Sequence, residues 1–365
     1  MKKKIKNIYL KINYKFNFFY IGLFLLPSAF ALAAIFLLIS LIISSYSYKE
    51  NFLKDKSNIF FFVASILMII SSLIHTFTNN YLPYDFNHNL SWIGLANWFP
   101  FFWCFNSFKP YLNSTEKRRR ASLILLTGSF PVLITGLGQT FFNWHGPFEI
   151  FNGFIIWYQR PLQLDIDGLT GLFNNPNYAG IWLNVIWPFC VATILDKREY
   201  LIQNLSIYFF TFGISFCTVL TNSRSAWLGI FLGSLIMLGR KSFNLIRNSF
   251  LILSLIISAT IYPIFGLKIQ NVFKEFIPER FWLEFSDFQF SRIEIWKSGI
   301  SSIINYPFFG TGASSFPEIF RLQTGLWKGH AHNLPLELII SYGIPVGVLI
   351  FYPILKISYE SIKRT

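Results

Sequence analysis

The sequence has 365 residues, of which 53% are hydrophobic and only 13% are charged, and its mean hydropathy is +0.47. A soluble globular domain carries about 25% charged residues, so this composition excludes an ordinary soluble enzyme. The net charge of +14 comes from short clusters of Lys and Arg between apolar runs, which is the pattern of cytoplasmic loops and not of a nucleic-acid-binding surface.

The first apolar stretch covers about 17–45 and is interrupted by Pro27-Ser28-Ala29. Its basic N-terminal flank leads into a run that is too long for the apolar part of a cleavable signal peptide. Basic residues flank both ends, so a short hairpin or re-entrant segment is favoured over the alternative of one long tilted helix.

Further spans of about 20 apolar residues are predicted along the rest of the chain. Because helices satisfy their own backbone hydrogen bonds in lipid, we expect an all-α polytopic transmembrane helix bundle of about 8–10 spans. Residues 1–365 are expected to form a single integral membrane domain. The predicted spans after the first stretch are 58–77, 91–108, 120–142, 178–195, 201–220, 226–239, 248–266 and 334–355.

Loops rich in Lys and Arg alternate with poor ones, and the positive-inside rule then orients the chain in the membrane. The cytoplasmic set is predicted to be 46–57, 109–120, 196–200, 240–247 and the tail, with both termini on the same side. The non-cytoplasmic set is 78–90, 143–177, 221–225 and 267–333. Loops 143–177 and 267–333 are long enough to be functional, and the second precedes the last helix.

Three arginines in the non-cytoplasmic segments are candidate ligands for an anion. Arg224 sits between two apolar runs, where a charge costs about 3 kcal/mol and usually faces a polar cavity; the alternative is an arginine that reaches the lipid headgroups. Arg292 lies on a predicted amphipathic helix, with an exposed polar face as the alternative reading. Arg160 lies in loop 143–177.

His332 is the candidate general base. Asn333 suits a helix N-cap and Pro335 the first turn, so His332 is expected just before a helix N-terminus. The positive end of a helix dipole disfavours imidazolium, and a neutral imidazole can accept a proton. Alternatives are an ordinary interfacial histidine, or a metal-binding pair with His330 that lacks a third ligand.

Several cations and one base on one side of the membrane suit an anionic amphiphile such as a lipid-linked phosphate or pyrophosphate. Other motifs carry less weight. Gly310-Thr311-Gly312 lacks the third glycine of a dinucleotide fingerprint, and Asp165-Ile166-Asp167 is a D-x-D spacing common by chance. The cysteines are expected to be small core residues, namely Cys104, Cys190 and Cys217.

Over roughly residues 90–350 the chain resembles the O-antigen ligase/polymerase superfamily. One block is similar to that of members often found in cyanobacteria, Phe173-Asn174-Asn175-Pro176-Asn177-Tyr178-Ala179-Gly180. The family carries further spans after the histidine-bearing helix, whereas this sequence ends soon after 355. The other matching blocks are Ser223-Arg224-Ser225-Ala226-Trp227-Leu228-Gly229, Arg292 with Pro307 and Gly310-Thr311-Gly312, and His332-Asn333-Leu334-Pro335-Leu336-Glu337 with Gly343-Ile344-Pro345.

The resemblance implies a GT-C-like, metal-independent, inverting glycosyltransferase of the bacterial inner membrane. Its donor would be an undecaprenyl-pyrophosphate-linked glycan, and its acceptor a hydroxyl of lipid A core, a glycan or a protein. The reaction would use no cofactor and no nucleic acid, and membrane lipid would surround the protein. Carried over residue by residue, Arg224 and Arg292 would bind pyrophosphate, Arg160 would be a third contact, and His332 would be the base.

Other functions remain open at this point. A polysaccharide polymerase would need the same pyrophosphate site as a ligase. A bicarbonate transporter of the same superfamily would place charges near the bilayer midplane and often shows inverted repeats, and the sequence has neither. A structural subunit of an envelope assembly would not need converging arginine and histidine side chains.

Overall fold

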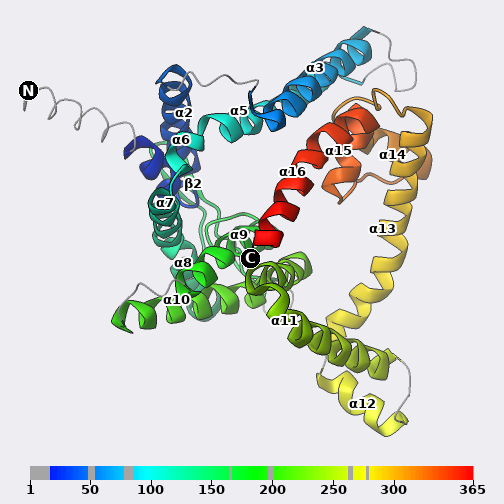
Figure 1. Cartoon of the computed structure of the whole chain (residues 1–365). Coiled ribbons are helices and arrows are strands. Elements are labelled where there is room, and N and C mark those ends of the chain that lie inside the picture. Colours follow the sequence, from blue (N-terminus) through cyan, green and yellow to red (C-terminus); the bar gives the residue numbers. More distant parts are fainter. Residues whose placement is uncertain are drawn as a thin grey trace, which may run out of the picture. The chain divides into compact units, whose positions relative to one another are not determined.

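The computed structural model describes residues 17–47, 54–77, 86–163, 167–195, 201–261, 266–276 and 279–364. Most of these residues are helical and strands are short and few among them, which confirms the predicted all-α class (Figure 1). The basic N-terminus and the predicted loop 196–200 lie outside the described residues. Five described helices are long and apolar enough to cross a membrane: Phe30–Ser47, Lys56–Phe77, Thr115–Phe142, Pro176–Leu195 and Ile344–Ser361.

The chain divides into two compact units, each built from two stretches of sequence. Unit 1 comprises Met1–Lys49 and Ser107–Asn244, and unit 2 comprises Glu50–Asn106 and Leu245–Thr365. The single domain expected over 1–365 stays a prediction. Each unit has its own core and its own candidate residues.

Unit 1 begins with two helical arms. Residues 17–25 are helical, a turn follows at 26–28, and α2 runs over Phe30–Ser47. The arms lie against each other, since a Cβ on Gly22 would fall 2.7 Å from Leu37. The turn falls at the predicted proline break and agrees with a hairpin.

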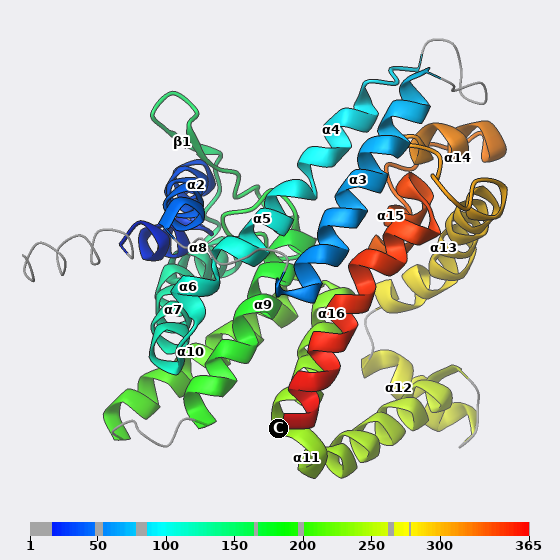
Figure 2. The same ribbon diagram turned by 45° about the horizontal axis from the view of Figure 1, so that its top comes forward.

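The rest of unit 1 is a helical cluster around one apolar core. Ser114 caps α7 by accepting a hydrogen bond from the backbone N–H of Lys117, as serine does at helix N-termini. Figure 2 shows α9 and α10 side by side, and the core lies between these helices and α7 and α8. The helices are α6 (Lys109–Leu112), α7 (Thr115–Gly128), α8 (Phe130–Phe142), α9 (Pro176–Leu195), α10 (Leu201–Leu220) and the start of α11.

The segment predicted as loop 143–177 is ordered by a hairpin and by one buried side chain. Strands β1 (Phe148–Ile150) and β2 (Ile155–Trp157) pair antiparallel. Gln139 of α8 is 1% exposed, and its amide donates to the carbonyl of Arg160 (2.6 Å) and to the hydroxyl of Thr170 (2.8 Å). Its carbonyl accepts from the backbone N–H groups of Thr170 (2.9 Å) and Gly171 (3.0 Å).

The predicted loop 240–247 between two spans is wrong, because α11 runs unbroken over Arg224–Ile261. Lys and Arg are good helix formers, and the basic cluster contains neither glycine nor proline, so the local sequence gives the helix no reason to stop.

Unit 2 contains most of the remaining helices. Figure 2 shows α3 beside α4 and α16, and α15 packs on α13 and α16. The predicted loop 267–333 is largely helical, consistent with the amphipathic helix expected around Arg292. The elements are α3 (Lys56–Phe77), α4 (Leu90–Ala96), α5 (Phe99–Ser107), α12 (Leu267–Phe276), α13 (Glu279–Asn305), α14 (Phe316–Thr324), α15 (Leu334–Tyr342) and α16 (Ile344–Arg364).

Two predicted spans of unit 2 are each split into two helices. Span 91–108 becomes α4 and α5, and span 334–355 becomes α15 and α16. The second split falls at Gly343, which has φ +90°, and a Cβ there would lie 2.2 Å from the carbonyl oxygen of Phe308. Only glycine fits both the backbone angle and the close approach.

Candidate functional site

His332 lies directly before α15, as the sequence predicts. The side chain of Asn333 accepts the backbone N–H of Leu336 at 3.1 Å, which makes Asn333 the N-cap, and Pro335 lies in the first turn. His332 itself has a left-handed backbone with φ +52°, which turns the chain sharply into the helix. The side chain of His332 therefore lies at the N-terminal end of α15.

The surroundings of His332 favour its neutral form. Partial burial lowers its pKa first, and the nearby His330, Arg292 and Lys328 lower it further. The backbone N–H of His332 donates to Nδ1 of His330 at 3.1 Å, and the two rings lie 4.1 Å apart between centroids. An imidazole that is neutral near pH 7 can take a proton from a hydroxyl.

The structure brings Arg292 to His332. Trp296 follows Arg292 by one turn of α13, and its indole N–H donates to the carbonyl of Ala331 at 3.2 Å. Ala331 immediately precedes His332 and is fully buried. Its own N–H donates to Oε2 of Glu337 at 2.7 Å. The residue before the histidine is thus held from α13 on one side and from α15 on the other.

His75 is a buried histidine that contacts the turn before α14, and this turn in turn binds α15. No motif in the sequence indicates this role. His75 of α3 is 4% exposed, and its Nε2 lies 3.2 Å from the carbonyl oxygen of Phe309, which also accepts from the hydroxyl of Ser71 at 2.7 Å. The turn that follows Phe309 binds α15, because Thr311 N–H donates to the carbonyl of Ile340 at 2.7 Å. The contacts of His75 and Ser71 with Phe309 join residues more than 200 positions apart in the sequence, so no local pattern predicts them.

Arg160 lies in unit 1 and forms an ion pair with Asp167 at 2.7 Å. Its guanidinium is 43% exposed and the carboxylate 22%, so the pair is accessible from solvent. Asp167 is the second acid of the D-x-D spacing, and Asp165 lies outside the described residues. The ion pair thus gives Asp167 a partner within the same loop.

Arg224 is exposed at the first residue of α11, also in unit 1. The hydroxyl of Ser223 donates to Oδ1 of Asn177 at 2.9 Å, which ties the start of α11 to the start of α9. Gly168, next to Asp167, would place a Cβ 1.9 Å from the carbonyl oxygen of Thr221. The segment that carries the Arg160 ion pair therefore contacts the turn that leads into Arg224.

The Asn174-Asn175-Pro176-Asn177 run has the capping role that its composition indicates. The side chain of Asn175 accepts the backbone N–H of Asn177 at 2.8 Å at the entry to α9. The four candidate residues thus form two groups: Arg292 with His332 in unit 2, and Arg160 with Arg224 in unit 1. In the ranges that the structure describes, no three His, Cys, Asp or Glu side chains gather as a metal site would require.

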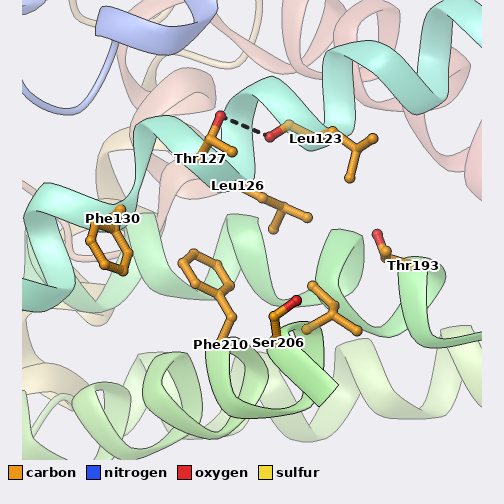
Figure 3. Close-up of a pocket in the computed structure, with 8 residues that line it drawn as sticks. Leu123, Leu126, Thr127, Phe130, Thr193, Ser206 and Phe210 are labelled. Atoms are coloured by element: carbon orange, nitrogen blue, oxygen red, sulfur yellow. Dashed lines mark hydrogen bonds between the residues drawn. The ribbon is translucent and has the colours of Figure 1, made fainter. Parts of the chain in front are cut away.

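Several cavities among the described residues offer space for a ligand. One of about 530 Å³ lies between α7, α9 and α10 in unit 1, where Leu126, Phe130 and Phe210 face it with the hydroxyls of Thr193 and Ser206 (Figure 3). It has no charged lining residue and therefore suits an apolar chain. A second cavity of unit 1, about 590 Å³, is lined largely by aromatic residues of 153–158 and the turn at 26–28.

The third cavity, about 760 Å³, belongs to unit 2 and has polar and acidic lining residues. Gly329 and Leu334, on either side of His332 in the chain, both line it. This cavity is therefore the one that adjoins the candidate base.

One protein family matches part of the chain. Residues 209–351 match the family model described as O-Antigen ligase, which confirms the resemblance seen in the sequence; Arg224, Arg292 and His332 fall inside this region and Arg160 outside it. The chain is also similar to a ComP-specific O-oligosaccharyltransferase of Acinetobacter baylyi, with 26% identity over 209 residues. That alignment covers 53% of this chain but only 36% of the relative. No solved structure matches the chain.

Proposed function

We propose that this chain, which carries the O-antigen ligase family domain over residues 209–351, moves a glycan from an undecaprenyl-pyrophosphate donor to a hydroxyl acceptor. The transfer would take place at the outer face of a bacterial inner membrane, and both termini of the chain would lie in the cytoplasm. The observation that carries the proposal is the grouping of Arg292 with a histidine whose pKa is lowered. A glycan transfer from a pyrophosphate needs these two kinds of group.

His332 takes the proton of the acceptor hydroxyl as its oxygen attacks the anomeric carbon. The bond from that carbon to the pyrophosphate oxygen breaks, and its electron pair leaves with the pyrophosphate. Attack from the face opposite the leaving group inverts the anomeric centre. No metal is needed in this step if guanidinium groups stabilise the charge that develops on the leaving oxygen.

Arg292 is proposed to stabilise that charge, because it already lies close enough to lower the pKa of His332. For Arg224 and Arg160 in unit 1, the proposed contact with pyrophosphate rests on their chemistry and their sequence context. Asp167 offsets part of the charge of Arg160, so the effect of replacing Arg160 should be smaller than that of replacing Arg224.

The relative named above is an O-oligosaccharyltransferase, which supports a hydroxyl acceptor without deciding whether it is lipid A core, another glycan or a protein. The acceptor is therefore best found by offering all three classes to the purified protein. Transfer to a growing glycan would make the chain a polymerase, and transfer to either of the others a ligase.

The proposal is tested by transfer assays on purified protein, with a polyprenyl-pyrophosphate oligosaccharide as donor and a chelator present. Arg292→Ala should lower kcat by about 10²- to 10³-fold, and Arg292→Lys should recover only part of it, because a point charge lacks the bidentate fork. Arg247→Ala is the matched control, since Arg247 is an exposed arginine of α11 that contacts its neighbour Asn248. Equal rates for Arg292→Ala, Arg247→Ala and the wild type would refute the pyrophosphate role.

A further inference from the structure

The cavity of about 760 Å³ in unit 2 has features that the transfer step does not use. Its inner lining includes Gly94, Ala313 and Tyr342, which are buried, and its outer lining includes Asn97 and Ser314, which are exposed. Such a volume is typical of small-ligand sites. We call it the Tyr342 cleft.

The hydroxyl of Tyr342 is a polar group left unsatisfied at the cleft. Tyr342 is 1% exposed, and within the described part of the chain its hydroxyl has no hydrogen-bond partner. A buried polar group without a partner costs about 1–3 kcal/mol. Gly94 packs closely against this hydroxyl, since a Cβ there would lie 2.8 Å from the hydroxyl oxygen.

Glu337 joins the cleft to the candidate base. One of its oxygens accepts the N–H of Ala331, the residue before His332, at 2.7 Å. A carboxylate has about four acceptor positions, so most of its capacity remains for a ligand in the cleft that Glu337 lines. A ligand bound there would lie beside the segment that carries His332.

The lining selects among ligand classes. The carboxylate of Glu337 repels phosphate and other anions. A lipid chain would leave the amide of Asn97 and the hydroxyls of Ser314 and Tyr342 unused. A saccharide offers hydroxyls to all of these groups, and its ring C–H faces can pack on aromatic rings such as Trp98, which also lines the cleft. We propose that the Tyr342 cleft binds a saccharide unit of one of the two glycan substrates next to His332. This inference rests on the proposed function for its biological role, but binding itself can be measured without transfer.

The first test measures binding alone on the full-length protein. Phe101 lines the cleft, is exposed and has no polar group in the proposed site, so Phe101→Cys is the probe. It is made in a Cys104→Ser background, because Cys104 is partly accessible while Cys190 and Cys217 are buried. The rate of modification by a maleimide is then measured with methyl glycosides of common hexoses and N-acetylhexosamines. We expect at least one glycoside to slow modification about fivefold or more. Asn89→Cys, on an exposed residue outside the cleft, is the control and should react at an unchanged rate.

The second variant is Tyr342→Phe, which removes one oxygen atom. Combined with Phe101→Cys, it should raise the glycoside concentration for half-maximal protection by about fivefold. The thermal midpoint should not fall, because the hydroxyl that is lost has no hydrogen-bond partner among the described residues. A purely structural role for Tyr342 would instead change the midpoint and leave protection unaltered.

In the transfer assay, Tyr342→Phe should raise KM for one substrate and leave kcat within about twofold. A higher KM for the acceptor assigns the saccharide to the acceptor, and a higher KM for the donor assigns it to the donor. If no glycoside protects, if a long-chain alcohol protects instead, or if Tyr342→Phe leaves protection unchanged, the cleft proposal is overturned. If a glycoside protects but the protein transfers no glycan, the proposed function is refuted while the proposal that the cleft binds a saccharide is supported.

Discussion

Gln139 offers a test of how loop 143–177 is held in place. Its amide makes four hydrogen bonds to the backbone or side chains of Arg160, Thr170 and Gly171. Gln139→Leu keeps roughly the same size but leaves the N–H groups of Thr170 and Gly171 and the carbonyl of Arg160 without this partner. At about 1–3 kcal/mol for each unsatisfied group, local opening should become easier by about 3–5 kcal/mol.

Thr170→Val is the matched smaller change, because it removes only the hydroxyl that accepts from Gln139. That variant should cost about 1 kcal/mol. Hydrogen exchange followed by mass spectrometry, on peptides that cover 158–172, reads both effects directly. Exchange should be faster by about a hundredfold or more in Gln139→Leu and by about fivefold in Thr170→Val. Equal protection in Gln139→Leu and the wild type would refute the view that this side chain anchors the loop.

Three other changes have defined outcomes. Because the pKa of His332 is lowered, activity should fall with acidification only below about pH 6.5. Arg292→Gln removes a nearby positive charge, so the acidic limb of the kcat/KM profile should move to higher pH. An acidic limb that stays in place would argue against the proximity of Arg292 and His332. Trp296→Phe removes the hydrogen bond to Ala331 and should lower kcat about three- to tenfold. A variant with the kcat of the wild type would show that this hydrogen bond does not position His332. Gly343→Ala should destabilise the protein by at least about 2 kcal/mol, read as a lower thermal midpoint in detergent, since a Cβ has no room there; an unchanged midpoint would show that the turn can relax.

The sequence was most informative where local chemistry decides the structure. Asn333 and Pro335 indicate the start of a helix, and α15 begins at Leu334. Pro27 marks the turn between the first two helical arms. In each case a side chain or a fixed φ angle acts on backbone groups within a few residues, so the pattern and the structure have the same cause.

The predicted helix boundaries were wrong where they rested on charge and hydrophobicity alone and not on residues that start or end a helix. The basic cluster in 240–247 was interpreted as a loop because charge is expected outside the membrane, yet Lys and Arg continue a helix well. Conversely, hydrophobicity continues across Gly343, and the helix still breaks there. The Gly343-Ile344-Pro345 order, with glycine after one helix and proline near the start of the next, is a local signal for that break.

The contacts that position the candidate base could not be predicted from local patterns. Trp296 and Ala331 lie 35 residues apart, and His75 and Phe309 lie 234 apart. Either pair meets only after several helices have packed. Tyr342 falls within the predicted span 334–355, and nothing in the neighbouring sequence indicates that its buried hydroxyl lacks a hydrogen-bond partner among the described residues.

The central claim is that His332 is the base of a metal-independent glycan transfer. Its most direct test is the rate of glycan transfer by His332→Ala, with saturating polyprenyl-pyrophosphate oligosaccharide, a hydroxyl acceptor and a chelator. The account predicts a rate about 10²- to 10⁴-fold below that of the wild type, with donor KM and thermal midpoint little changed. A variant that transfers glycan at the wild-type rate would contradict it.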